Sequence, residues 1–227
     1  MSILNAVEPA SCTRLVDPEV VRKQASLPDD ETGASEAALL ADQVSAMAVT
    51  YTDREFAVEV VEEYVQGGGT PRLMLSRWPV VEVLEVESTD GAIIPNYMVD
   101  KKRGMLVSTE GPFKDGSMLG RDITTHRRAG GLGAPNYRVK YRAGYALPCM
   151  EAPETEGAPP LPMDLQQALV SAAVTLWQWR GRDSSLVSES IGDWSWTRGA
   201  MATTGMTGVP AEFRGVVGIL NKYAQVV

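Results

Sequence analysis

The side chains that most often perform chemistry in proteins are few and scattered in this sequence. The single histidine, His126, lies in a glycine-rich stretch, with Asp122 shortly before it. A Ser-His-Asp hydrolase needs a base held against a nucleophile, yet the sequence has no G-x-S-x-G motif or equivalent nucleophile setting. We therefore interpret His126 as a solvated loop residue and expect that the protein is not an enzyme.

Patterns that bind phosphates or metals are also missing from the sequence. It has no P-loop motif and no G-x-G-x-x-G motif, and the glycine runs at residues 67–69 and 130–133 are not followed by the helix that a phosphate site requires. Neighbouring acids such as Glu62 and Glu63 lack the spacing of metal ligands. We expect no cofactor and no metal.

Composition limits the class of protein further. The chain has 227 residues, 44% of them hydrophobic, which is ordinary for a globular protein with a sizeable core. Its formal net charge of −8 argues against a general nucleic-acid binder. The same charge would suit the wall of a channel through which DNA passes without being bound. The first residues do not resemble a secretory signal, and no apolar run approaches the roughly 18 residues of a membrane span, so we expect a soluble protein made in the cytoplasm.

The cysteine content fits a reducing compartment. The two cysteines, Cys12 and Cys149, are far apart in the sequence and do not form a C-x-x-C motif. Disulfide frameworks occur mainly in small secreted domains that are rich in cysteine. We therefore predict two free thiols.

Helical patterns occupy the two ends of the sequence. A short helix is predicted after Asp17, with Pro18 at its first position, and a longer one after Ser35 as the N-cap. A third helix is predicted between Pro162 and Gly181, and a last one over residues 210–223. The buried stripes predicted by the helical spacing are Leu40, Val44, Met47, Ala48 and Tyr51 in the second helix, and Leu165, Leu169, Ala173 and Leu176 in the third.

Strand patterns lie between these helices. Residues 56–65 alternate with Phe56, Val58, Val60 and Tyr64 on one face and Glu59 and Glu63 on the other, although a continued helix is an alternative. Further strands are predicted on both sides of Pro79 and in a hairpin closed by Gly104. Residues 137–143 give the clearest alternation, with Tyr137, Val139 and Tyr141 facing one way and Arg138, Lys140 and Arg142 the other, which predicts a sheet with one wet, basic face.

Three features fit neither pattern. Residues 109–136 form a long connection with little apolar content, which is unusual inside a compact domain. Trp177 and Trp179 point to different faces of the third helix, so we expect one in the core and the other at an interface. Residues 188–199, with the sequence SESIGDWSWTRG, combine two tryptophans with polar neighbours. These features indicate a binding or assembly protein.

The order of helices, strands and helices predicts an α+β fold. We expect a single domain over residues 1–227. In it, a helical bundle framework, made of the N-terminal helices and the long C-terminal helix, covers residues 13–53 and 161–224. An antiparallel β insertion covers residues 54–145, and an extended C-terminal arm covers residues 184–209.

Several short motifs, taken in order, resemble those of a known family. They are DDETGASEAALLADQVSAMAVTYTDREF, VEVVEEYV, LMLSRWPVVEVLEV, YMVDKKRGMLV, VKYRAGYALP, LPMDLQQALVSAAVTLWQWRGR and SESIGDWSWTR. Together they resemble the head–tail connector (adaptor) proteins of tailed bacteriophages and gene transfer agents, over residues 13–223. The chain departs from the family pattern in the extended connection at 109–136 and in GAMATTGMTG after the tryptophans.

This resemblance implies a structural role in the neck of a virion. Adaptors form a ring, generally of twelve subunits, under the portal protein; the ring extends the DNA channel and docks stopper or tail-completion proteins. The helices form the ring body, and a C-terminal segment engages the portal. The implied partners are therefore the portal protein, a stopper or tail-completion protein, other copies of the chain, and double-stranded DNA that passes without specific binding. No membrane is implied.

The resemblance also suggests which residues make the contacts. We expect the arm to bind the portal, through Ser190, Ile191, Gly192, Asp193, Trp194, Trp196 and Arg198. Acidic and basic strands are expected to meet between subunits, through Glu59, Glu62 and Glu63 on one side and Arg138, Lys140 and Arg142 on the other. The connection at 109–136 is either a disordered surface loop or a contact to a neighbour or another neck protein, through Arg121, His126, Arg127 and Arg128.

Two other functions are compatible with the sequence. The first is a neck or host-attachment binding module that does not form a ring. The second is a DNA-packaging accessory protein, which would need clustered acids or a nucleotide-binding loop, and the sequence shows neither.

Overall fold

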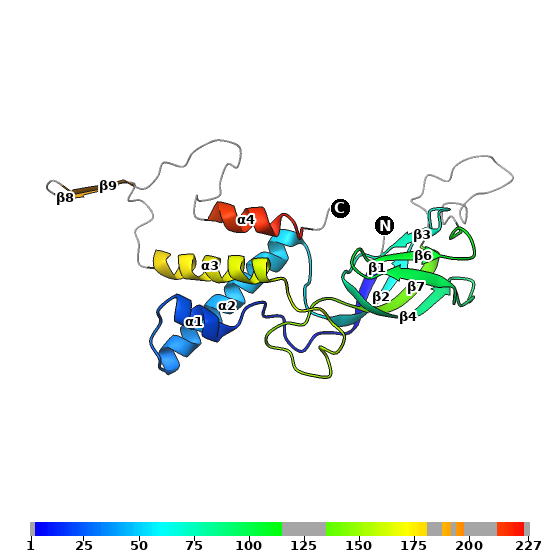
Figure 1. Ribbon diagram of the computed structural model, residues 1–227, viewed down its shortest axis with the longest axis horizontal. Coiled ribbons are helices and arrows are strands. Elements are labelled where there is room, and N and C mark those ends of the chain that lie inside the picture. Colours follow the sequence, from blue (N-terminus) through cyan, green and yellow to red (C-terminus); the bar gives the residue numbers. More distant parts are fainter. Residues whose placement is uncertain (1–2, 115–134, 181–187, 192–193, 198–212, 225–227) are drawn as a thin grey trace. The chain divides into compact units, whose positions relative to one another are not determined.

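The computed structural model describes residues 3–114, 135–180, 188–191, 194–197 and 213–224 (Figure 1). The chain divides into two compact units. The β unit contains Met1–Cys12 and Phe56–Pro160, and the helical unit contains Thr13–Glu55 and Leu161–Val227. The described residues form four helices, two antiparallel sheets and a separate two-stranded hairpin, so the mixed α+β class predicted from the sequence is confirmed.

The helical unit contains α1 (Pro18–Gln24), α2 (Glu31–Thr52), α3 (Met163–Trp179) and α4 (Arg214–Leu220). Helix α1 begins as predicted, because the Asp17 side chain accepts a hydrogen bond from the backbone N–H of Glu19. In Figure 1 and in the contacts between elements, α3 packs against α1, α2 and α4. None of the helices in the described residues is long and apolar enough to span a membrane.

Helix α2 begins earlier than the sequence pattern predicted. Its N-cap is Asp30, whose carboxylate accepts a hydrogen bond from the backbone N–H of Gly33 at 2.7 Å. Ser35, the expected cap, lies inside the helix. Gly33 looks like a helix breaker in the sequence, but a Cβ at this position would lie 2.0 Å from the carbonyl oxygen of Pro28. The glycine therefore allows the preceding loop to pass close to the first turn of α2.

The β unit contains two antiparallel sheets. The first has the order β1-β2-β7-β4, with β1 at Ile3–Glu8, β2 at Glu59–Val65, β7 at Tyr137–Ala143 and β4 at Val80–Ser88. The second has the order β3-β6-β5, with β3 at Arg72–Met74, β6 at Met105–Ser108 and β5 at Tyr97–Asp100. Strand β1 was not predicted from the sequence, whereas the strands flanking Pro79 and the hairpin closed by Gly104 were.

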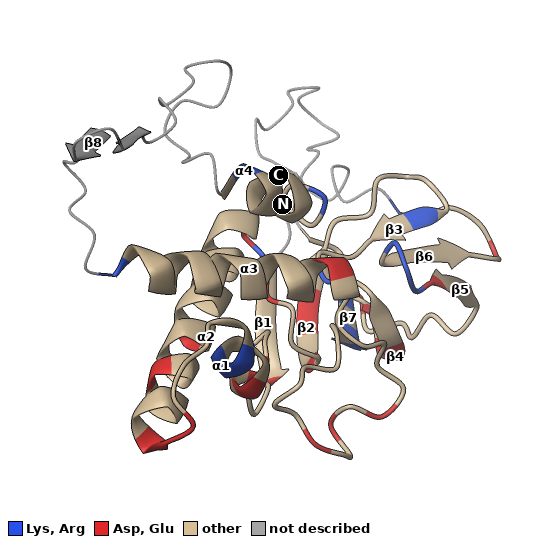
Figure 2. Cartoon of the chain, turned by 60° about the vertical axis from the view of Figure 1, so that its left-hand side comes forward, with Lys and Arg blue, Asp and Glu red and all other residues tan. Residues whose placement is uncertain are grey.

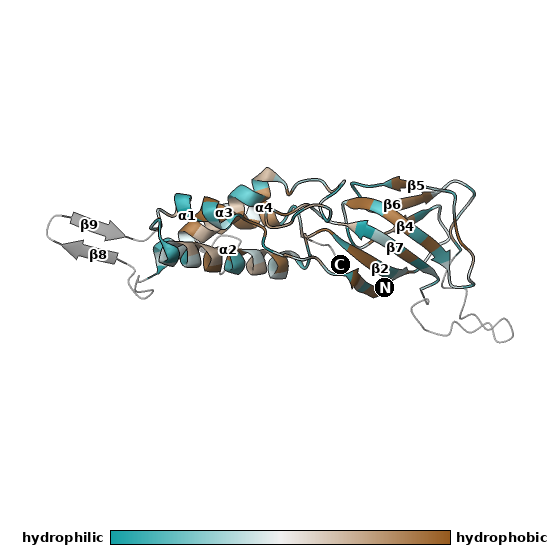
Figure 3. Ribbon diagram, turned by 90° about the horizontal axis from the view of Figure 1, so that it is seen from below, coloured by the Kyte–Doolittle hydropathy of each residue, from teal (hydrophilic) through white to brown (hydrophobic). Residues whose placement is uncertain are grey.

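Apolar side chains from both sheets form the core of the β unit, and hydrophobic and hydrophilic bands alternate along its strands (Figure 3). The inward face of β7 was predicted correctly, since Tyr137, Val139 and Tyr141 are buried. The prediction of the inward face of β2 was wrong. Val61, Glu63 and Val65 point inward, while Val60, Glu62 and Tyr64 remain partly exposed. The sequence Val-Val-Glu-Glu fits an alternating pattern in either register, so periodicity could not choose between them.

The prediction of two free thiols was also wrong. Cys12 and Cys149 form a disulfide within the β unit, with their Cα atoms 6.1 Å apart. Cys12 follows β1 and Cys149 follows β7, and the pairing of β1 in the same sheet brings the two residues together. Because β1 was not foreseen, the separation of 137 residues along the chain gave no sign of this contact.

Candidate interaction surfaces

The predicted portal-binding arm contains a β-hairpin. Strand β8 (Ser188–Ile191) pairs antiparallel with β9 (Trp194–Thr197), and the register places Ile191 opposite Trp194 and Glu189 opposite Trp196. Among the described residues these two strands form a sheet of their own. The expected extended segment is therefore a hairpin whose two strands each have a second edge available for strand addition. Gly192, Asp193 and Arg198 lie outside the described residues.

The outward face of the first sheet carries charges of both signs. Each basic residue of β7 lies opposite an acid of β4, and the pairs are Arg142 with Glu82, Lys140 with Glu85 and Arg138 with Glu87. Figure 2 colours basic residues blue and acidic residues red. On the other side of β7, Lys140 lies opposite Glu62 of β2. Cross-strand pairs of opposite charge stabilise a sheet. The face expected to be basic is therefore a mixed one in which acids flank every base.

Arg138 is the centre of this charged face. Its guanidinium pairs with Glu87, with Glu85 at 3.1 Å and with Glu62 at 3.4 Å. Hydrogen bonding to Glu87, followed by the negative charge of Glu87, raises the pKa of Arg138. Arg138 and Glu62, which the sequence placed on two opposing faces, thus pair inside one chain.

Glu59, Glu63 and Arg142, also predicted for subunit contacts, have partners in the β unit as well. Glu59 forms an ion pair with Arg77 at 2.9 Å, and the two side chains are only 9% and 16% exposed. Arg142 donates to the backbone carbonyl of Glu154. Glu63 is fully buried, so it has no atom with which to meet a second subunit. A role of the other five residues between subunits stays a prediction.

The carboxylate of Glu63 organises the turn between the two sheets. It accepts a hydrogen bond from the hydroxyl of Tyr141 at 2.6 Å, and both the backbone N–H and the hydroxyl of Ser76 donate to it. The Tyr141 oxygen accepts in turn from the backbone N–H of Arg77 at 3.2 Å. Burial raises the pKa of Tyr141, and the charge of Glu63 raises it further. Because Glu63 and Tyr141 are both fully buried, we interpret the cluster as structural rather than catalytic.

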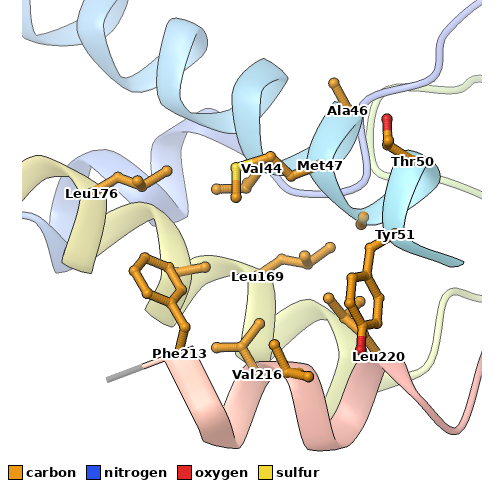
Figure 4. A pocket seen from close by; sticks show the side chains of 13 residues that line it. Val44, Ala46, Met47, Thr50, Tyr51, Leu169, Leu176, Phe213, Val216 and Leu220 are labelled. Atoms are coloured by element: carbon orange, nitrogen blue, oxygen red, sulfur yellow. The ribbon is translucent and has the colours of Figure 1, made fainter. Parts of the chain in front are cut away.

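An apolar groove of about 630 Å³ crosses the surface of the helical unit (Figure 4). It lies between α2, α3 and α4. Its lining includes Val44, Met47 and Tyr51 from α2, Leu169 and Leu176 from α3, and Phe213, Val216 and Leu220 from the α4 region. Met47 and Tyr51, predicted to be buried, are instead 51% and 44% exposed. The Tyr51 hydroxyl donates to the side-chain oxygen of Asn221 at 2.7 Å, which ties α2 to the end of α4.

The tryptophans of α3 do not divide into one core and one surface residue. Both are half-buried. Trp179 packs edge-to-face on Phe213 with ring centres 5.3 Å apart, and this contact attaches the start of α4 to the end of α3. The guanidinium of Arg180 lies 5.3 Å from the centre of the Trp177 ring. Trp179 therefore contacts the start of α4 in the same chain, a contact that the sequence did not predict.

Two other expectations concern sites outside the sheets and helices. Arg121, His126, Arg127 and Arg128 all lie outside the described residues, so their expected contact to a neighbour stays a prediction. In the part of the chain that the structure describes, no group of three or more histidine, cysteine or acidic side chains is arranged to hold a metal ion.

Comparison with known proteins gives a structural likeness only. No family model matches the chain, and no curated protein matches it. A chain in the structure "Virion of native gene transfer agent (GTA) particle" is similar, with a TM-score of 0.52, 15% identity, and coverage of 99% of this chain and 96% of that one. Chains in "Neck of empty GTA particle computed with C6 symmetry" and "Neck of native GTA particle computed with C12 symmetry" have TM-scores of 0.49, at 16% and 14% identity and with the same coverage. The virion match shows that the two chains share a fold over nearly their whole lengths.

Proposed function

We propose that this chain is a structural protein of the virion neck, at the head–tail interface of a tailed bacteriophage or gene transfer agent. The observation that carries this proposal is the virion match, which extends over 99% of this chain and 96% of the other. The match covers both units of the chain, and the step from a shared fold to a shared function is an analogy, because one fold can serve several functions. The ordered motifs, which resemble those of adaptor proteins, support the same role.

Within that role, the chain is an adaptor that forms a ring, generally of twelve copies, beneath the portal. A closed ring uses head-to-tail contacts, which require two different surfaces on each subunit. The apolar groove between α2, α3 and α4 supplies one surface suited to such a contact. The helical unit then forms the body of the ring. The net charge of −8 suits a channel through which DNA passes without being bound.

The arm hairpin is the portal-binding element of this proposal. Strand addition to a sheet edge uses backbone hydrogen bonds for affinity and alternate side chains for specificity. The β8–β9 hairpin has its outer edges available for such pairing among the described residues. Trp194 and Trp196 both belong to β9, two residues apart in the sequence.

Binding to capsids that contain the portal but lack tails tests this function. The wild-type chain should sediment with these capsids and not with capsids that lack the portal. Deletion of residues 188–199, or the double substitution Trp194→Ala and Trp196→Ala, should leave a folded monomer that stays in the supernatant. Lys102→Ala, at an exposed position in the β unit, is the matched control and should sediment like the wild type. Sedimentation of the arm variants at the wild-type level would refute the role of the arm, and failure of the wild type to sediment would refute the neck function.

A further inference from the structure

The N-terminal strand β1 has little packing to hold it in the first sheet. It is an edge strand, and its antiparallel pairing with β2 is interrupted between Ala6 and Glu8. Only Leu4 is partly buried and packs on the core of the β unit, while Ile3 and Val7 are 51% and 44% exposed. Segments with few buried apolar contacts and solvent-exposed backbone hydrogen bonds open most easily.

The disulfide compensates for this weak attachment. Cys12 lies shortly after the end of β1, and its partner Cys149 lies between Leu147 and Met150, which are both buried. The hydroxyl of Ser11 also donates to the carboxylate of Glu154 in the same part of the β unit. The end of β1 is therefore joined covalently to a fixed part of the unit that contains β2.

Reduction of the disulfide would change how β1 is tethered. With the disulfide intact, a few residues separate the end of β1 from a point on the β unit, so an open strand stays at high effective concentration near β2. Without it, the chain from β1 to β2 runs through Thr13–Glu55, which belongs to the helical unit. The cost of closing a loop rises with its length, so the closed position of β1 loses stability.

We propose that the Cys12–Cys149 disulfide is a redox latch on β1, and that in the dithiol form β1 leaves β2 and is replaced by β1 of a second copy. The proposal does not depend on the neck function. It assigns a redox-controlled contact between copies to the edge of the first sheet, a contact made by exchange of identical strands.

The identity of the second strand follows from the pairing in the closed chain. The edge of β2 over Glu59–Val65 already accepts Ile3–Glu8 in one register, with Ile3 opposite Tyr64 and Leu4 opposite Glu63. The same segment from a second copy brings the same backbone groups and the same Leu4 contact. Exchange of an identical element between subunits therefore needs no new complementary surface, and an open sheet edge favours strand addition.

The chemistry of the latch is thiol–disulfide exchange. A glutathione thiolate attacks one sulfur of the Cys12–Cys149 bond, which releases the other as a thiolate and leaves a mixed disulfide. A second glutathione thiolate attacks the glutathione sulfur of that mixed disulfide, so the chain gains two thiols and one oxidised glutathione forms. Oxidised glutathione reverses both steps. Both cysteines are half-buried rather than fully buried.

Hydrogen exchange of the full chain tests the latch, at a dilution at which the copies are monomeric and no second copy supplies a strand to β2. After reduction, the backbone amides of Ile3–Glu8 and the β2 amides that bond to them should exchange faster, while those of β7 and α3 should keep their rates. The double variant Cys12→Ser and Cys149→Ser should behave like the reduced wild type in both oxidising and reducing buffers. Unchanged rates in β1 after reduction, or an equal increase throughout the β unit, would overturn the latch.

Isotope mixing tests the exchange between copies. Heavy and light chains are reduced together, mixed and reoxidised with oxidised glutathione, and the Cys12–Cys149 peptides are then identified by mass. The disulfide records which copy each β1 occupies, so heavy–light peptides should be about as abundant as same-isotope peptides, and they should be absent without reduction. The double variant Leu4→Pro and Asn5→Pro, which cannot form the strand ladder, should lose them. Same-isotope peptides alone, or heavy–light peptides that persist in the proline variant, would overturn strand exchange.

Discussion

Tyr141 donates its hydroxyl to the buried carboxylate of Glu63 on the neighbouring strand, with 2.6 Å between the two oxygens. The same carboxylate accepts from Ser76, and the Tyr141 oxygen accepts from the backbone N–H of Arg77. One pair of side chains thereby joins β2 and β7 to the turn that leads from the second sheet back to β4. The stability of the β unit should depend on this pair.

Substitution Glu63→Gln should destabilise the β unit. It keeps the size of the side chain but replaces one acceptor oxygen by an NH₂ group that faces donors. Because the site is fully buried, the free energy of unfolding should fall by about 1–3 kcal/mol. Urea unfolding measures this change. Glu82→Gln, on the exposed part of β4, is the control and should be near neutral; equal stabilities of the Glu63→Gln variant and the wild type would contradict the assignment.

The same pair predicts a loss of stability at alkaline pH. Burial raises the pKa of Tyr141 above its ordinary value, so the phenol stays neutral in the folded chain while it ionises in the unfolded chain above a pH of about 10. The stabilisation linked to Tyr141 is therefore complete below that pH and declines as the pH rises past it. Unfolding midpoints measured from about pH 9 to about pH 11 should fall less steeply for Tyr141→Phe than for the wild type. Parallel profiles would show that Tyr141 does not cause the loss.

The position of Glu63 also shows which parts of the β unit can be predicted from the sequence and which cannot. The hydrophobic spacing located the strands and identified the inward face of β7. It failed for β2 because Val60, Val61, Glu62 and Glu63 fit either register, and the buried acid is explained only by donors on Ser76 and Tyr141, which are distant in the sequence.

Features that depend on contacts across the chain were missed for a similar reason. Strand β1 is short and mostly exposed, so its sequence lacks the apolar alternation of an inner strand. The disulfide requires β1 to be in place, so it could not be foreseen either. The groove was not predicted from the sequence, because the spacing of Met47 continues the buried stripe of α2. In the structure α4 does not cover Met47, which remains half-exposed.

Two glycines with different surroundings should respond in opposite ways to alanine. Gly144 has a φ of +127°, and a Cβ there would lie 2.3 Å from the carbonyl oxygen of Ala57. Gly144→Ala should therefore lower the free energy of unfolding by more than about 1 kcal/mol. Gly218, in α4, has open space around it, and Gly218→Ala should raise helix stability by up to about 1 kcal/mol. Thermal unfolding compares the two, and tolerance of alanine at Gly144 would contradict the strained turn.

The groove in the helical unit predicts separate effects on folding and assembly. Leu169 is buried at its base, so Leu169→Ala should cost about 2–5 kcal/mol of unfolding free energy. Met47 is half-exposed at its edge, and Met47→Gln should cost less than about 1 kcal/mol while reducing ring assembly. Chemical unfolding and mass measurement of the assembled particles give the two readouts. Normal assembly of the Met47→Gln variant would remove the groove from the ring contact.

The most direct test of the neck function is density for the neck of assembled particles that contain this chain. The predicted result is a closed ring of copies directly beneath the portal, around the DNA channel, with residues 188–197 of each copy against the portal. Absence of the chain from the neck, or its presence there as isolated copies that form no ring, would contradict this account.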